Sequence, residues 1–288
     1  MTDTSAHAIP LIDSILHPTD FTEGSRVAFC HALKVALMAK SRLTLLHVSK
    51  GSAANFPGVR ETLERWRLLP SGSPRSAVPK LGIDVRKVIT RQSGPVKAVL
   101  RYLGDHPADL IVLATHQHKG RAHWLSHSVA EPVARRAAQM TLFIPGDSAG
   151  FVSSSDGSVA LDHILIPVAA TPRPQAAIEA GARLVAHLNC PRGTFTLLHV
   201  GSPGEMPAVR CPDVPGWEWK KVTRPGEVIH AILDTAQASA ANLIVMTTDG
   251  RDGFLDALRG SHSERVLRQS LAPVLAVPVG SLAAAQRD

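Results

Sequence analysis

The stretch that decides the fold reads GRDGFLDALRGSHSERVLRQSL, from Gly250 to Leu271, and it follows the apolar run NLIVMTT at Asn242–Thr248. The apolar run is typical of a buried strand, and the pair Gly260-Ser261 opens a predicted helix. Glycines let backbone N–H groups approach an anion closely, and a helix N-terminus adds positive partial charge. We therefore interpret the segment as a strand, a phosphate-binding loop and a helix.

The same layout occurs once before, as DLIVLATHQHKGRAHWLSHSVAEPVARRA at Asp109–Ala137, without the loop glycines. Other segments also recur in order. ILHPTD at Ile15–Asp20 matches ILIPVA at Ile164–Ala169, and LTLLHV at Leu43–Val48 matches FTLLHV at Phe195–Val200. The chain is therefore an internal repeat of one fold, and the first copy has the longer central segment.

Each copy is predicted to alternate short apolar strands with amphipathic helices, which indicates a parallel, doubly wound α/β sheet. We expect two Rossmann-like domains, 1–147 and 161–288, joined by a Ser- and Gly-rich linker at 148–160. Each domain would be a mostly parallel five-stranded sheet flanked by helices. Ligands in such sheets bind beyond the carboxyl ends of the strands, where both loops leave. The first-copy strands are expected at Ser14–His17, Leu43–Val48, Val85–Thr90, Leu110–Leu113 and Thr141–Ile144, buried on both faces.

Composition limits the classes of protein. A chain of 288 residues with 44% hydrophobic and 19% charged residues is globular. The net charge of +7 suits anionic ligands, but the basic residues are scattered without interleaved aromatics, so we expect no nucleic-acid partner. No apolar run reaches membrane-spanning length, and no signal peptide is expected. Three cysteines form no disulfide framework, which favours a reducing, cytoplasmic location.

With these motifs in register twice, the chain resembles a tandem universal stress protein. The family pattern is Pro-x-Asp after the first strand, a second strand LLHV, and a loop G-x-x-G-x9-G-[S/T] after the fourth. The resemblance implies adenine nucleotide alpha hydrolase-like domains, whose loop holds the phosphates and ribose of ATP. It also implies that the first-strand Asp and the end of the second strand hold the adenine.

Carried over to the second copy, the pattern gives a nearly intact nucleotide loop in which Thr247 replaces the first glycine. The remaining implied binding positions are Gly250, Arg251, Gly253, Gly260, Ser261, Val200, Pro167 and Ala169. Ala169 replaces the usual Asp, which removes a contact on the adenine side.

The first copy departs in the opposite way. It keeps Asp20, Val48 and Ser128, but Ala114, Gln117 and His127 replace the loop glycines. Side chains there crowd the space that phosphates need. We expect one nucleotide per chain, in the second domain: ATP, ADP or AMP, with Mg²⁺ as the only metal.

Simpler interpretations stand beside these. Ser128 and Ser261 each begin an S-x-x-E pattern, which also predicts a helix capping box. Arg251 suits a phosphate or plain solvent exposure. His116, His118, His123 and His127 crowd the first loop and can converge on a transition metal, although no Cys, Asp or Glu accompanies them. His47 and His199, inside the LLHV strands, are expected to pack or to form hydrogen bonds.

No catalytic constellation can be assigned from spacing, so we expect no enzyme, and weak ATP hydrolysis ranks last. The leading hypothesis is a cytoplasmic stress-response protein that binds adenine nucleotide and acts on an unidentified protein partner. The alternative is a nucleotide-independent scaffold or sensor, with a metal or small ligand at the first-domain histidines. The resemblance implies an intramolecular pseudo-dimer through Thr141–Ile144 and Val274–Val277, which can pair again into a homodimer.

Overall fold

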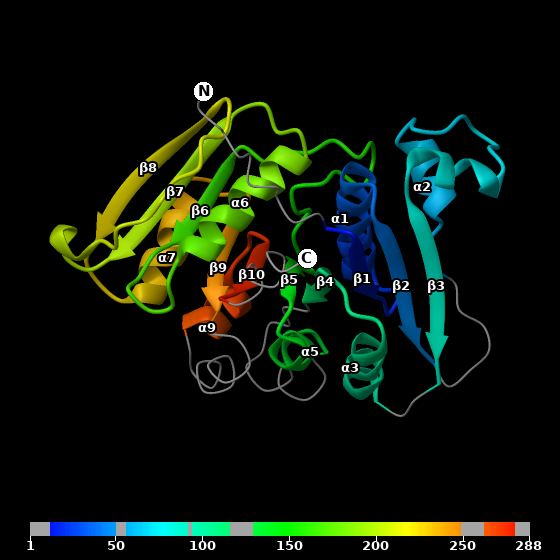
Figure 1. The fold of residues 1–288 in the computed structure, drawn as a ribbon, viewed down its shortest axis with the longest axis horizontal. Coiled ribbons are helices and arrows are strands. Elements are labelled where there is room, and N and C mark those ends of the chain that lie inside the picture. The colour runs from blue at the N-terminus through cyan, green and yellow to red at the C-terminus, as the bar shows by residue number, and fades with distance from the viewer. Residues whose placement is uncertain (1–11, 50–55, 92–93, 116–128, 249–261, 280–288) are drawn as a thin grey trace, which may run out of the picture.

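The computed structural model describes residues 12–49, 56–91, 94–115, 129–248 and 262–279. Figure 1 shows that strands and helices alternate along both halves, as the repeat predicts. The first half contains β1 (Ser14–Pro18), α1 (Glu23–Ala39), β2 (Arg42–Val48), α2 (Val59–Arg65), β3 (Asp84–Thr90), α3 (Pro95–Asp105), β4 (Leu110–Thr115), α5 (Ala130–Ala137) and β5 (Met140–Pro145).

The second half repeats this order without a counterpart of α2. It contains β6 (His163–Pro167), α6 (Gln175–His187), β7 (Gly193–Val200), β8 (Trp217–Arg224), α7 (Val228–Ala238), β9 (Leu243–Thr248), α9 (His262–Gln269) and β10 (Val274–Pro278). The longer central segment of the first half forms α2 and two 3-10 turns, Arg75–Ala77 and Pro79–Leu81. The second half has one such turn there, Pro203–Glu205.

All ten strands form one continuous sheet in the order β3-β2-β1-β4-β5-β10-β9-β6-β7-β8. Among the strands that the structure describes, pairing is parallel within each half, and β5 pairs antiparallel with β10, with Leu142 opposite Leu275. The expected junction between the last strands of the two copies is thereby confirmed. Antiparallel pairing there relates the halves by a pseudo-twofold rotation. Because the sheet twists, the outer strands β3 and β8 of the two halves both run toward the lower side of the view in Figure 1.

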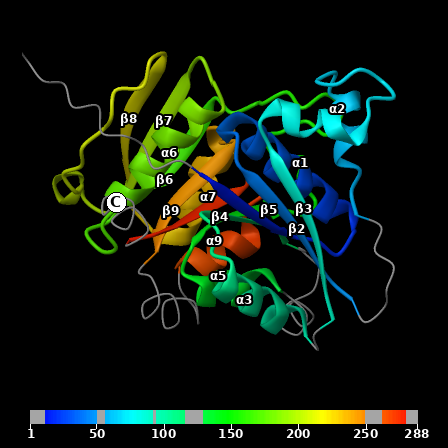
Figure 2. The same cartoon turned by 45° about the vertical axis from the view of Figure 1, so that its right-hand side comes forward.

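Two apolar layers cover the sheet. Successive side chains of a strand point to opposite faces. In β1, Ile15 packs in the layer under α1 and α6, whereas Leu16 packs in the layer under α3, α5, α7 and α9. Figures 1 and 2 show α1 and α6 on one side of the sheet and α3, α5 and α9 on the other. Both layers continue from one half into the other.

The central strands are buried as expected, and all six residues of β9 are buried. The edge strands correct this expectation. Every residue of β3 is exposed or half-buried, and so is most of β8. Both lie at the sheet's ends, where one side of the strand has no neighbour, and both carry charged residues such as Arg86 and Lys220. Charged edge strands resist further sheet pairing.

The segment 148–160, expected to be a linker, packs firmly on the first half. Phe151 and Val152 are buried in the layer under α1, and Val152 pairs with Val159 in an antiparallel bridge. The carbonyl of Ser154 accepts hydrogen bonds from Arg65 Nε at 3.0 Å and Trp66 Nε1 at 3.3 Å. The segment is therefore a structured tie between the halves, while the domain boundaries remain a prediction.

Candidate functional site

The ligand crevice of each half is set by the strand order. The chain moves outward from β6 to β7 and β8, then crosses back to place β9 on the other side of β6. Ligands of such sheets bind at this switch point, beyond the carboxyl ends of the strands. β9 ends at Thr248 and α9 begins at His262, so the end of β9 lies at the second-half crevice.

Five predicted site residues, Gly250, Arg251, Gly253, Gly260 and Ser261, lie outside the described residues. Gln117, Ser128 and the four loop histidines His116, His118, His123 and His127 also lie outside them. In the first half, α5 begins at Ala130 with Val129 at its N-cap position, without a side-chain capping bond. A capping role for Ser128 is therefore untested.

Thr247, the residue at the first glycine position, has a structural role. It lies in β9 opposite Val277 and is buried. Its Oγ1 accepts a hydrogen bond from the backbone N–H of Ala177 at 3.3 Å. Ala177 lies in the first turn of α6, where backbone N–H groups have no partner within the helix. Thr247 thus ties β9 to α6 beside the crevice, a role that sequence spacing does not show.

The two halves share one hydrogen-bond pattern at the ends of their first two strands, where the family resemblance places the adenine base. We call this edge the base side. In the first, Thr19 N–H donates to the carbonyl of Leu46 at 2.9 Å, and His47 Nδ1 bonds the carbonyl of Thr19 at 2.8 Å. In the second, Val168 N–H donates to Leu198 at 2.8 Å, and His199 Nδ1 bonds the carbonyl of Val168 at 3.1 Å. The expected hydrogen-bonding role of both LLHV histidines is confirmed.

The second-half base side carries small side chains. Pro167 ends β6 opposite Leu198, and Val200 ends β7 half-buried. Ala169 and Ala170 follow β6 and are exposed. The structure thus brings Pro167, Ala169, Val200 and Thr247 to the carboxyl edge from which the glycine loop leaves.

In the first half, Asp20 organises the start of α1. Its Oδ1 accepts hydrogen bonds from Thr22 N–H at 3.0 Å and from Thr22 Oγ1 at 2.7 Å. Thr22 is the N-cap of α1 and accepts from Ser25 N–H at 3.3 Å. Val48 ends β2 half-buried, and Ala114 is half-buried in β4 opposite Ile144. The first-half carboxylate expected to contact adenine therefore also holds the turn that leads into α1 by accepting two hydrogen bonds from the N-cap residue Thr22.

Sequence reasoning missed an aromatic cluster at this edge. Phe21, directly after Asp20, stacks on His47 with ring centroids 4.1 Å apart and planes 27° apart. Phe56 meets Phe21 edge-on at 5.6 Å, and Lys87 Nζ lies 5.8 Å from the Phe56 ring centroid. The sequence signal for this cluster is Phe21, an aromatic residue directly after the Pro-x-Asp motif.

The loop after β7 docks on the start of α6. Gln175 Nε2 donates to the carbonyl of Arg210 at 3.0 Å, and Arg210 N–H donates back to Gln175 Oε1 at 3.1 Å. Arg173 and Arg210 are both exposed near this point of the chain. Two cationic side chains at a helix N-terminus suit an anionic ligand.

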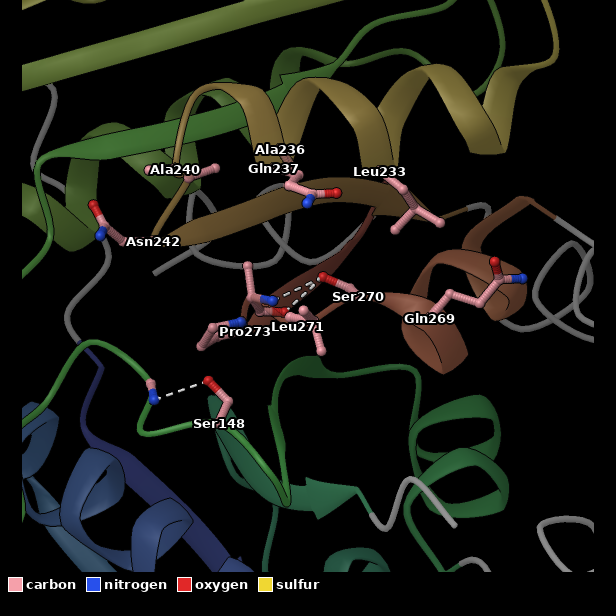
Figure 3. A pocket seen from close by; sticks show the side chains of 13 residues that line it. Ser148, Leu233, Ala236, Gln237, Ala240, Asn242, Gln269, Ser270, Leu271 and Pro273 are labelled. Atoms are coloured by element: carbon pink, nitrogen blue, oxygen red, sulfur yellow. Dashed lines mark hydrogen bonds between the residues drawn. The ribbon is translucent and has the colours of Figure 1, made fainter. Parts of the chain in front are cut away.

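A separate cavity of about 330 Å³ lies at the other end of the second-half strands. Figure 3 shows Gln237, Asn242 and Gln269 around it, with Ser148 of the connecting segment on its opposite wall. Its lining residues carry no charged side chain. It therefore does not fit the predicted anion, and it lies away from the glycine loop.

The described residues hold no group of three or more His, Cys, Asp or Glu that could bind a metal. Cys30, Cys190 and Cys211 are free thiols, as expected from their spacing. Burial raises the pKa of Cys30 and of Cys190 to about 11, so neither is an activated nucleophile. Over the described ranges, no helix has the length and apolar character to cross a membrane.

The fold is that of a tandem α/β protein with a mostly parallel sheet and two repeated halves. The sequence matches the universal stress protein family over residues 12–145 and 212–278, and the chain belongs to that family. A universal stress protein from Archaeoglobus fulgidus DSM 4304 is 19% identical, with a TM-score of 0.60 over 92% of this chain and 95% of its own.

A putative universal stress protein from Pseudomonas aeruginosa UCBPP-PA14 is 16% identical, with a TM-score of 0.59 over 97% of this chain and 98% of its own. These likenesses show the tandem fold. A universal stress protein in complex with cAMP covers 46% of this chain, with 97% of its own length, 19% identity and a TM-score of 0.32. No curated protein matches the sequence significantly.

Proposed function

We propose that this universal stress protein binds one adenine nucleotide per chain, as ATP, ADP or AMP, in its second half. The observation that carries the proposal is the placement of the two elements that flank the glycine-containing stretch in sequence, β9 and α9. Gly250, Gly260 and Ser261 belong to the connection that leaves β9 after Thr248, at the β6–β9 switch point, and enters α9 at His262. An anion at this place meets backbone N–H groups at the start of a helix.

The base side of the second half also favours nucleotide binding there. Ala169 and Ala170 are exposed and end at Cβ, so they leave room above β6 and β7 for a planar ring. Arg173 and Arg210 supply positive charge near the start of α6. We assign no catalytic role to any residue. Nucleotide binding would instead change the surface around α9 and the loop after β7, and thereby alter contact with a protein partner in the cytoplasm.

A second candidate is a nucleotide-independent scaffold, and Ala169 favours it. With Ala there, the base side lacks the carboxylate that the family pattern places after the first strand. A buried site selects a base mainly by hydrogen bonds to its polar edge. Losing one therefore weakens selectivity for adenine.

Native mass spectrometry of the purified protein, followed by calorimetric titration with Mg-ATP, tests the proposal. We expect the added mass of one nucleotide, or a titration with one site per chain. Gly260→Val should abolish binding, because a branched side chain would push the phosphates from the helix N-terminus. Gly104→Val is the matched control, since a Cβ at Gly104 in α3 meets nothing within 4 Å.

The outcomes separate the candidates. Two equivalent sites per chain would contradict selective binding by the second half. Absence of bound nucleotide, with wild type and Gly260→Val indistinguishable in the presence of ATP, would favour the scaffold.

A further inference from the structure

Phe21 adopts a backbone conformation that bulky residues rarely take. Its φ is 65°, in the left-handed region that favours glycine. Such conformations persist where the surroundings hold them, and they concentrate at functional sites. Here the conformation accompanies the stacking of the Phe21 ring on His47, with centroids 4.1 Å apart. The unfavourable backbone conformation of Phe21 therefore accompanies a position of its ring over the carboxyl end of β2.

Phe56 completes the arrangement from a different part of the chain. Its ring meets Phe21 at 80° with centroids 5.6 Å apart, and His47 at 81° and 6.4 Å. Edge-to-face contacts of this kind are favourable geometries for aromatic rings. The Lys87 ammonium lies 5.8 Å from the Phe56 centroid, within the range of a cation–π contact. Four segments therefore contribute to the arrangement: the β1–α1 turn, β2 with His47, the segment before α2, and β3 with Lys87.

The second half has the same frame without the rings. His199 bonds the carbonyl of Val168 as His47 bonds that of Thr19, so the two histidines are equivalent. Counting from the matched prolines Pro18 and Pro167, Phe21 corresponds to Ala170. Ala170 is exposed, and among the described residues no aromatic ring stacks on His199. The halves thus differ at this point by a stacked aromatic ring.

We propose that Phe21 and Phe56 occupy the place of a ligand's planar base in the first half, and that they restrict nucleotide binding to the second. They are specificity-determining residues that act by filling the subsite. This inference deepens the proposed function, on which it rests for the choice of an adenine base. The barrier lies on the base side, so it acts independently of the phosphate loop.

Equilibrium dialysis with labelled adenosine tests the inference, because adenosine carries the base without phosphates. Phe21→Gly/Phe56→Ala removes both rings, and glycine is the residue best suited to φ 65°. We expect the double variant to bind one adenosine per chain more than wild type. Leu68→Ala is the control: Leu68 is an apolar side chain of the first half, 44% exposed and outside the cluster. It should bind as wild type does.

The readout is a difference in stoichiometry, so it separates the two proposals. Wild type without bound adenosine and a double variant with one would contradict the proposed function and support the inference. Equal stoichiometry in a folded double variant would overturn the inference. If circular dichroism shows that the double variant is unfolded, Phe21→Gly alone decides by the same criterion. This single variant removes the ring that stacks on His47. If it is folded and binds no more adenosine than wild type, the inference is overturned.

Discussion

The Nε2 atom of His31 accepts a hydrogen bond at 3.0 Å from the backbone N–H of Phe151, 120 residues further along the chain. The N–H of Val152 donates to the same atom at 3.1 Å. Backbone N–H groups only donate, so Nε2 carries no proton, and Nδ1 bears the hydrogen that bonds the carbonyl of Val27 at 2.9 Å. A neutral, fully buried histidine in α1 thus fixes the segment that joins the two halves.

Replacing His31 by Ala should lower the free energy of unfolding by about 3 kcal/mol, since two buried N–H groups lose their acceptor and a cavity forms. Urea denaturation measures the loss. His187→Ala is a matched control, because His187 makes the same bond to a carbonyl one turn earlier, at 3.1 Å to Arg183, but accepts no bond from a distant segment among the described residues. Equal losses in the two variants would contradict a tie between the halves.

Stability should fall on mild acidification. Burial lowers the pKa of His17 and of His31 from 6.5 to about 4. Each histidine therefore takes up its proton more readily in the unfolded chain. Their contribution to stability is complete above pH 6.5 and is lost as the pH falls from 6.5 toward 4, by up to about 3 kcal/mol per group.

Unfolding free energies measured in urea between pH 7.5 and 4.5 check this linkage. His31→Gln should have a shallower dependence than wild type, because Gln does not titrate. A wild-type unfolding free energy that stays constant between pH 6.5 and 5 would show that these histidines are not buried in solution.

Gly150 lies in the same connecting segment, directly before Phe151, and approaches the His31 ring. Its φ is 66°, and an added Cβ would overlap the ring of His31. Gly150→Ala should therefore combine a backbone penalty of about 1 kcal/mol with a steric cost of about 1–3 kcal/mol. Gly72→Ala measures the backbone penalty alone, because the φ of Gly72 is 77° and a Cβ there meets nothing within 4 Å. Thermal and urea unfolding of both variants should show the larger loss for Gly150→Ala; equal losses would refute the close approach.

Much of the sheet could be predicted from sequence because the chain repeats. The expected Leu43–Val48 is β2, which begins one residue earlier, and Leu110–Leu113 is β4, which extends two residues further. The junction of β5 with β10 followed from the family resemblance. Burial on both faces was a wrong prediction for β3, because periodicity does not tell which strand lies at the sheet's edge.

The remaining features depend on contacts between distant residues. Ser- and Gly-rich composition predicted a linker at 148–160, but buried Phe151 depends on His31, and no local pattern links them. The sequence identifies Thr247 only as a departure from the glycine pattern, because its bond to Ala177 requires α6 and β9 to lie side by side. Phe21 and Phe56 are separated by β2 in sequence, and only the fold stacks Phe21 on His47 and brings Phe56 edge-on to both rings.

Replacing Ser261 should distinguish a role in helix capping from a role in phosphate binding. α9 begins at His262, so Ser261 directly precedes the helix, where a hydroxyl caps free backbone N–H groups. Ser261→Ala should therefore lower the unfolding free energy by about 1 kcal/mol without ligand. If the hydroxyl also contacts phosphate, the rise in melting temperature with saturating Mg-ATP will be smaller than in wild type. An unchanged rise with a lower starting temperature would assign Ser261 to capping alone. An unchanged starting temperature would show that Ser261 does not cap α9.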